Sequence, residues 1–269
     1  TLRGHDGAVM STAFLNDGRL ISAGMEGSIK LWSVEKGLEK ELTALVQGSQ
    51  VMAVVGAHVV TDQTTPSAPS LYAVGSTGLE EYSVSLGRRL ASYEGHDGVV
   101  CNIDCSSKSK LMSCGRDDQR IKMWKAEPRD YVTQEHNHQI NCVAVSTTHN
   151  LACSGDAGGK LCSWTIDEQL FTASVCCQAV GAHQNVITGV AFVPNVQVGA
   201  IVSTGEDGRV VLSDLSLTAV DMLQLESPQS ALALSQNGWI ALGGWDGKVT
   251  LLRVDYAGSR MVLQATVFI

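Results

Sequence analysis

Proline, aromatic residues and charged residues are all scarce in this sequence of 269 residues. It contains 5 prolines, 5% aromatic residues and 17% charged residues. So little proline excludes a collagen-like chain or a proline-rich linker. The low charge, together with a hydrophobic content of 44%, excludes general disorder, because there is ample material for a packed core. Apolar runs stay short of the ~20 residues that a membrane helix needs, so we expect no membrane span.

Basic residues are outnumbered by acidic ones. The chain has 19 Lys and Arg against 27 Asp and Glu, which gives a formal net charge of −8. Binding to nucleic acid relies on clustered Lys and Arg that neutralise phosphates, and the basic runs here are short. We therefore expect no direct binding to nucleic acid.

The cysteines lack the patterns of disulfide frameworks and metal sites. Eight are present without a Cys-x-x-Cys, most of them in strand-like hydrophobic runs, so we expect reduced, small buried residues and a cytoplasmic and/or nuclear protein. Cys101 and Cys105 would lie about 13 Å apart on one strand, too far for one zinc ion, and the adjacent Cys176 and Cys177 are interpreted as the same kind of buried residue. We expect no metal and no cofactor.

Glycine, in contrast, is abundant and recurs at a regular interval. The chain has 27 glycines, and a hairpin-like pattern of two short alternating runs joined by a Gly- and Asp-rich turn appears six times. A unit of about 40 residues fits all six, with one insertion at 61–70 and another around 171–181. The anchor glycines of the six units are Gly24, Gly75, Gly115, Gly155, Gly205 and Gly244.

Additional strands flank these hairpins. Runs such as 9–14, 140–145 and 186–192 precede a hairpin, and runs such as 89–93, 220–225 and 261–268 follow one, whereas no stretch has a convincing helical period. Six units of four strands are best arranged radially, because one four-stranded sheet cannot bury both faces alone. We therefore predict an all-β propeller forming a single domain over residues 1–269, within a longer chain because the sequence opens in mid-pattern.

The units resemble the WD-repeat (WD40) family of β-propellers. The markers are Gly4-His5 leading to Leu31-Trp32 and Gly95-His96 leading to Met123-Trp124, with looser versions from Glu135-His136 to Trp164 and from Ala182-His183 to Ser213-Asp214. Six blades can be identified. The pattern leaves open a six-bladed ring, a seventh blade outside this segment, or completion by a strand or blade from a partner or from the rest of the chain.

The resemblance implies a buried chain of His, Ser or Thr, Asp and Trp in each complete blade. In the fourth unit, His136, Ser154, Asp156 and Trp164 have shifted spacing, which puts their geometry in doubt. The sixth unit keeps only Asp246 and the second keeps none convincingly. The implied networks comprise His5, Ser22, Glu26 and Trp32 in the first unit; His96, Ser113, Asp118 (or Asp117) and Trp124 in the third; and His183, Ser203 and Asp207 in the fifth, where Ser213 replaces Trp.

A hydrolase triad is the competing interpretation of Ser, His and Asp in one unit. The set recurs from unit to unit, which a single active site would not do, and a Gly-x-Ser-x-Gly elbow that would expose a nucleophile is missing. We therefore expect a non-catalytic protein rather than an enzyme.

Family geometry also implies which side chains would meet a partner. The turn inside each hairpin and the loop entering each inner strand share one face, so residues there would be exposed, and Trp is enriched at binding hot spots. We expect a scaffold that binds other proteins or peptides; recognition of a peptide or modified tail on behalf of a partner enzyme is the alternative. The predicted partner-binding residues are Trp245, Arg116, Met25, Glu206, Met10, Asn141 and Thr188.

Overall fold

The computed structural model describes residues 3–15, 18–33, 35–43, 50–57, 70–76, 78–105, 111–125, 130–146, 148–167, 172–196, 199–235, 237–255 and 260–268. Its regular elements are 24 β-strands in six four-stranded antiparallel sheets. The predicted all-β propeller with six four-stranded blades is therefore confirmed. In the part of the chain described, no helix is long and apolar enough to cross a membrane.

The chain divides into two compact units, residues 1–135 and 136–269, and each holds three blades. In the first unit, blade 1 consists of β1 (Val9–Phe14), β2 (Leu20–Gly24), β3 (Ser28–Ser33) and β4 (Gly37–Thr43); blade 2 of β5 (Val51–Ala57), β6 (Ser70–Gly75), β7 (Gly78–Ser83) and β8 (Arg88–Tyr93); and blade 3 of β9 (Val100–Cys105), β10 (Leu111–Gly115), β11 (Arg120–Lys125) and β12 (Asp130–Glu135).

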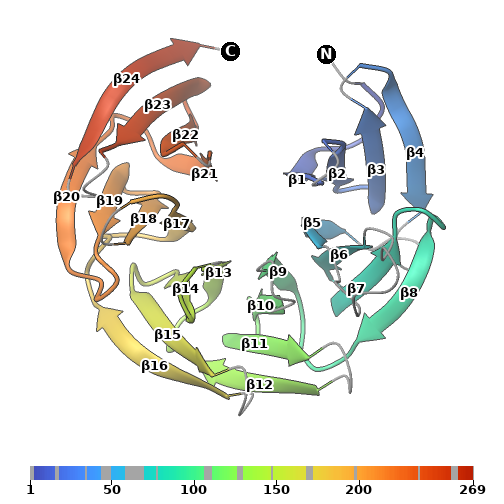
Figure 1. Ribbon diagram of the computed structural model, residues 1–269, viewed down its shortest axis with the longest axis horizontal. Helices are drawn as coiled ribbons and strands as arrows, with labels where there is room; N and C mark the ends of the chain where they lie inside the picture. The colour runs from blue at the N-terminus through green and yellow to red at the C-terminus, as the bar shows by residue number, and fades with distance from the viewer. Residues whose placement is uncertain are drawn as a thin grey trace. The chain divides into compact units, whose positions relative to one another are not determined.

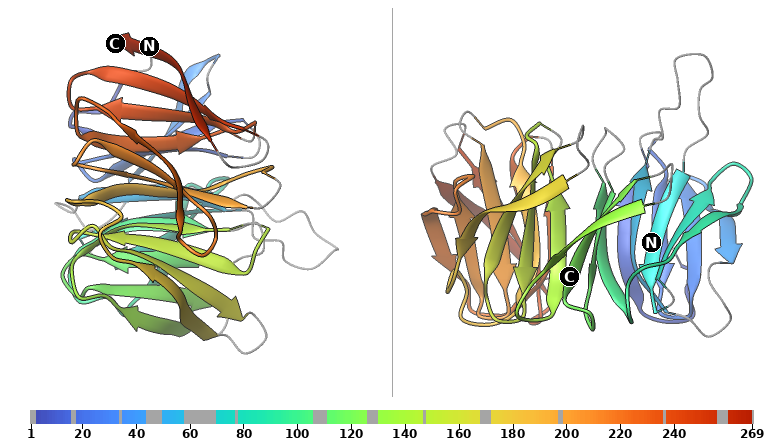
Figure 2. Two further views of the ribbon diagram at one scale, coloured as in Figure 1. Left: turned by 90° about the vertical axis from the view of Figure 1, so that its left-hand side faces the viewer. Right: turned by 90° about the horizontal axis from the view of Figure 1, so that it is seen from below.

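The second unit repeats this plan. Blade 4 consists of β13 (Ile140–Val145), β14 (Leu151–Asp156), β15 (Leu161–Asp167) and β16 (Thr172–Ala179); blade 5 of β17 (Ile187–Val193), β18 (Ala200–Gly205), β19 (Arg209–Ser213) and β20 (Ala219–Gln224); and blade 6 of β21 (Gln229–Leu234), β22 (Trp239–Gly244), β23 (Lys248–Val254) and β24 (Met261–Phe268). Each blade can be followed from inner to outer strand in Figure 1, and the strands are seen side-on in Figure 2.

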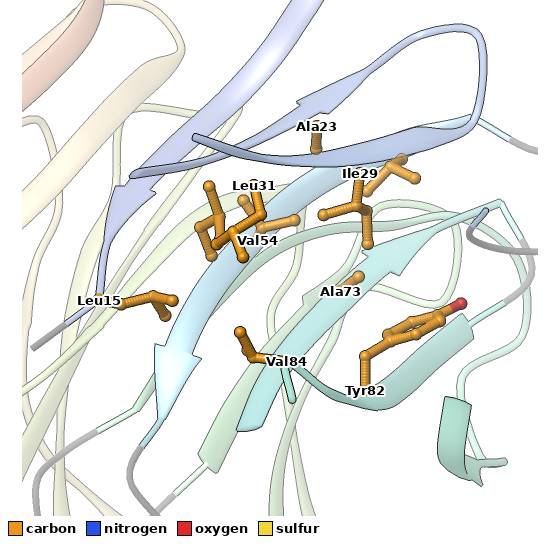
Figure 3. Packing of buried hydrophobic residues seen from close by; sticks show 10 residues of the cluster. Leu15, Ala23, Ile29, Leu31, Val54, Ala73, Tyr82 and Val84 are labelled. Atoms are coloured by element: carbon orange, nitrogen blue, oxygen red, sulfur yellow. The ribbon is translucent and has the colours of Figure 1, made fainter. Parts of the chain in front are cut away.

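Within each unit, the blades pack through their inner strands. The inner strand of one blade lies against the first two strands of the blade before it, as β5 does against β1 and β2, and as β21 does against β17 and β18. Alternating side chains fill these contacts, because successive residues of a strand point to opposite faces. Figure 3 shows the contact between blades 1 and 2, where Ile29, Leu31, Val54 and Tyr82 are at most 5% exposed. Each such side chain contributes roughly 1.5–3 kcal/mol of hydrophobic stabilisation.

Every inner strand carries a β-bulge at the same point. One residue near the start of the strand has no partner on the second strand, as between Ile140 and Cys142 or between Ile187 and Gly189. A bulge of this kind bends the strand and redirects a side chain. The bulged residues are Met10, Met52, Cys101, Asn141, Thr188 and Ser230.

The two predicted insertions have different outcomes. Most of the first, at 61–70, lies outside the described residues, and only Ser70 is seen, as the start of β6. The second, around 171–181, contains β16, the outer strand of blade 4. The single domain over 1–269 stays a prediction.

Candidate functional site

Blade 3 contains a complete buried network that links its inner loop to its third strand. The Nδ1 atom of His96 lies 2.7 Å from Asp118 Oδ2, and its Nε2 atom lies 2.7 Å from Ser113 Oγ. The Trp124 indole donates to the same Ser113 Oγ at 2.7 Å. The acid of this network is thus Asp118, while Asp117 accepts the backbone N–H of Val99 at 2.9 Å.

The arrangement of donors assigns the histidine tautomer. Because the indole N–H occupies one side of the serine oxygen, the serine hydroxyl donates to His Nε2, and Nδ1–H donates to the carboxylate. Burial lowers the pKa of His96, and the nearby Asp118 offsets only part of this effect. The ring is therefore neutral and serves as a hydrogen-bonded bridge inside the blade.

Blade 1 uses a longer acid in the same network. His5 Nδ1 pairs with Glu26, and His5 Nε2 lies 2.6 Å from Ser22 Oγ, which accepts the Trp32 indole N–H at 2.7 Å. Burial tends to raise the pKa of Glu26, but hydrogen bonds from Ser28 and His5 outweigh it and lower the pKa to about 2. Glu26 is thus an ionised acceptor at neutral pH.

Blade 4 also has a complete network, although the spacing of its residues in the sequence is shifted. His136 lies 3.2 Å from Asp156 and 2.9 Å from Ser154, which accepts the Trp164 indole N–H at 2.8 Å. Asp156 is the last residue of β14, and its Oδ1 accepts the N–H groups of Gly158 and Lys160. The acid therefore comes from a strand end and still closes the turn that follows it.

Blades 5, 2 and 6 lack one or more residues of this network. In blade 5, His183 bonds Asp207 at 3.0 Å and Ser203 at 2.9 Å, while Ser213 occupies the Trp position opposite Ile201. Blade 2 has Tyr82 at the Trp position, and the buried Glu80 accepts from Tyr82 and from Arg89. Blade 6 has leucines at the His, Ser and Trp positions. Its acid, Asp246, is kept and pairs with Lys248.

The His side chains of these networks are too deeply buried to act as a general base on a substrate. The His side chains of blades 3, 4 and 5 are at most 1% exposed and that of blade 1 is 5% exposed. A general base must come within hydrogen-bond reach of the proton it removes. Their chemistry is therefore structural: each network joins the loop, the second strand and the third strand of its blade.

Four of the seven residues predicted to face a partner occupy one repeated position: Met25, Arg116, Glu206 and Trp245. In every blade, the first turn residue after the second strand donates its backbone N–H to the carbonyl just before the inner strand, as Met25 does to Ala8 and Trp245 does to Pro228. The residues at this position are Met25, Ser76 and Arg116 in the first unit, and Ala157, Glu206 and Trp245 in the second. In blade 4 the position belongs to Ala157, because the second strand extends through Asp156.

The side chains at this position differ in character and exposure. Trp245 is 65% exposed and Met25 is 47% exposed, and Arg116 and Glu206 are half-buried. A constant backbone bond thus holds a variable side chain at the surface, which is the arrangement expected of a recognition loop on a rigid scaffold.

The predicted residues Met10, Asn141 and Thr188 are bulged residues of the inner strands. Met10 is 39% exposed, whereas Thr188 is half-buried and donates its hydroxyl to the Gln229 carbonyl at 2.6 Å, which links blades 5 and 6. The buried Nδ2 atom of Asn141 has no hydrogen-bond partner among the residues that the structure describes. Met10 is therefore available to a partner, while Thr188 already serves as an internal contact.

A cavity of about 450 Å³ lies on blade 1 where no blade of the first unit covers it. Val9, at its wall, is 51% exposed, although Val51 and Val100 at the matching position of blades 2 and 3 are fully buried. The other lining residues include Thr12, Leu20 and Trp32. Among the described residues, no group of three or more His, Cys, Asp or Glu side chains is placed to hold a metal ion.

Comparisons with known proteins agree with this architecture. The model of the family "WD domain, G-beta repeat" matches residues 1–33, 87–125 and 129–165. The chain is 26% identical over 146 residues to the intraflagellar transport protein 80 homolog of Mus musculus, covering 54% of this chain and 18% of that protein. It is 22% identical over 246 residues to the ribosome biogenesis protein YTM1 of Coccidioides immitis, covering 81% and 52%. It thus spans from a fifth to half of the length of these relatives.

A solved structure extends the likeness over nearly the whole chain. The crystal structure of RRP9 WD40 repeats superposes with a TM-score of 0.81 at 19% identity, covering 98% of this chain and 82% of that one. The likeness supports the fold rather than a function. The matched repeats, the six blades and the His-Ser-acid-Trp networks together confirm the resemblance to the WD-repeat family of β-propellers.

Proposed function

We propose that this chain is a non-catalytic scaffold for protein–protein interaction, acting as a subunit or domain of a multiprotein assembly. The observation that supports it is the repeated turn position. One backbone hydrogen bond recurs in all six blades, while the side chain it presents changes from Met25 to Arg116 to Trp245. The names of two relatives, an intraflagellar transport protein and a ribosome biogenesis protein, also favour membership of an assembly. The cytoplasm and/or the nucleus remains the location we propose, on the basis of the cysteine pattern.

Trp245 is the strongest candidate contact in the second unit. It is 65% exposed in a turn of glycine and polar residues, and Trp contributes most when a partner buries it fully. In the first unit, Met25 and Met10 provide flexible apolar surface, and Arg116 provides charge. The partner we propose is a protein or peptide with an apolar anchor.

The test is affinity purification followed by mass spectrometry, comparing wild type with Trp245→Ala and Arg116→Glu. Trp239→Ala is the matched control, because Trp239 is also exposed but lies at the opposite end of β22. We expect Trp245→Ala and Arg116→Glu to reduce partner recovery several-fold, with Trp239→Ala unchanged. Equal recovery by all variants would refute the site.

A related proposal is that a further blade docks on the face of blade 6 that no blade of the second unit covers. In blade 5, Val202 and Leu212 are fully buried against blade 6, whereas Ala241 and Leu251 at the same register positions of blade 6 are only half-buried. An apolar sheet face at a blade-packing position fits another blade, supplied by a partner or by other parts of the protein.

A photo-crosslinking amino acid at position 251 tests this second proposal. We expect crosslinks to a peptide with alternating apolar residues, typical of an inner strand. If the assembled complex yields no crosslinked product from position 251, the docked blade is ruled out. The alternative role, selection of a peptide or modified tail for a partner enzyme, predicts instead that short peptides compete with the partner recovered through Trp245.

A further inference from the structure

Cys176 and Cys177 are neighbours in the sequence, and their thiols also lie side by side. In a regular strand, adjacent side chains point to opposite faces. In β16, however, Val175 pairs with Trp164 and Cys177 pairs with Ser163, so Cys176 is an extra, bulged residue. The bulge brings the two Sγ atoms to 3.6 Å.

This pair lies at the surface, in contrast to the buried small residues that the sequence predicts. Cys176 is exposed and Cys177 is half-buried, on the outer strand of blade 4. The other close thiol pair, Cys101 and Cys114, has Sγ atoms 3.5 Å apart, but both side chains are buried. The two pairs therefore have similar spacing and differ in access to solvent.

The geometry favours a bridging ion over a disulfide. Consecutive Cα atoms are about 3.8 Å apart across a trans peptide, which is shorter than the 4.4–6.8 Å usual for disulfides. A zinc ion at about 2.3 Å from each sulfur would span a gap of 3.6 Å with an S–Zn–S angle of about 103°, close to the tetrahedral value.

We propose that Cys176 and Cys177 form a two-thiolate site that binds the thiophilic metal ion Zn²⁺. Each thiol releases its proton to solvent, each sulfur supplies the electron pair of one Zn–S bond, and the other two coordination positions hold water or donors from a partner. The described residues place no third His, Cys, Asp or Glu at this point. The site is independent of the scaffold function proposed above.

The deciding experiment measures Zn²⁺ binding by reduced, untagged protein in competition with a chromophoric chelator. We expect one Zn²⁺ per chain, and affinity reduced by roughly a hundredfold in Cys176→Ser and in Cys177→Ser, because loss of even an outer-shell partner costs 10- to 100-fold. Cys101→Ser is the matched control, since it breaks the buried pair and keeps the exposed one. Circular dichroism confirms that each variant is folded.

Phenylarsine oxide provides a second probe of the spacing. It bonds two neighbouring thiols and releases one water, so capture should be reversed by a dithiol and not by a monothiol. Capture should be lost in either serine variant of the exposed pair and kept in Cys101→Ser. The proposal is overturned if the Cys176→Ser/Cys177→Ser double variant binds Zn²⁺ as tightly as wild type, or if Cys101→Ser abolishes binding.

Discussion

Gln229 and Ile187 occupy the same register position in neighbouring inner strands, opposite Gly244 and Gly205, yet only Gln229 buries an unpaired polar atom. Gln229 is 3% exposed, and its Nε2 atom donates to the Ser227 carbonyl at 2.7 Å. A flipped amide would place two oxygens together, so the unpaired atom is the oxygen, Oε1.

Replacing Gln229 with isoleucine should stabilise the protein. The matching residues of blades 2 to 5 are Val or Ile and are fully buried. A buried acceptor without a partner costs about 1–3 kcal/mol, and the lost bond to Ser227 is worth about 1 kcal/mol, so we expect a gain of up to about 2 kcal/mol. Denaturant unfolding measures it. The reciprocal Ile187→Gln should destabilise, and a lower midpoint for Gln229→Ile would contradict the argument.

Removing the serine of a complete network should cost more than removing it from a partial one. Ser154→Ala removes the partner of both His136 Nε2 and the Trp164 indole N–H, whereas Ser203→Ala removes the partner of His183 Nε2 alone. Each buried group left unsatisfied costs about 1–3 kcal/mol. We therefore expect Ser154→Ala to lower the free energy of unfolding about twice as much as Ser203→Ala. Equal losses would show that the indole bond contributes nothing.

Acid should weaken the fold from just below neutral pH. Burial lowers the pKa of His183, despite the opposing effect of Asp207. The unfolded chain takes up this proton near its ordinary pKa of about 6.5, while the folded chain resists it. Stability is therefore full above about pH 6.5 and falls as pH decreases below it.

Carboxylates extend this loss at lower pH. Burial acts to raise the pKa of Asp207, but hydrogen bonds from the Gln184 backbone and His183 outweigh it and lower the pKa. Its stabilisation is present above the unfolded value of about 3.8 and is lost as pH falls through the folded one. Unfolding curves at pH 7.5, 6.5 and 5.5 measure the histidine effect, and curves at about pH 4 and below measure the carboxylate effect. His183→Asn should be less stable with a flatter pH profile, and the exposed His138→Asn should keep the wild-type profile; stability that rises on acidification would sink this explanation.

How much the sequence predicts depends on whether a feature is local. The hairpins follow from Gly- and Asp-rich turns between alternating runs, and the networks of blades 1, 3 and 5 are implied by the resemblance to the WD-repeat family. The network of blade 4 is obscured because Asp156 ends a strand instead of lying in the turn. The exposure of Cys176 is not local either, since the bulge that creates it is defined by pairing with β15.

The turn glycines offer a test of how one blade rests on the next. Gly159 and Gly247 both have positive φ, 76° and 74°, and both donate to the residue that begins their turn. A Cβ on Gly159 would lie 2.2 Å from the His183 carbonyl oxygen of the next blade, whereas one on Gly247 would meet nothing within 4 Å. Backbone strain alone costs about 1–2 kcal/mol, so Gly247→Ala should lose about that much. Gly159→Ala should lose more, because the clash also disrupts the bond from the His183 N–H to the Gly159 carbonyl. Thermal unfolding of the two variants compares them directly. Equal losses of stability would mean that the contact between blades 4 and 5 rearranges without an energetic penalty.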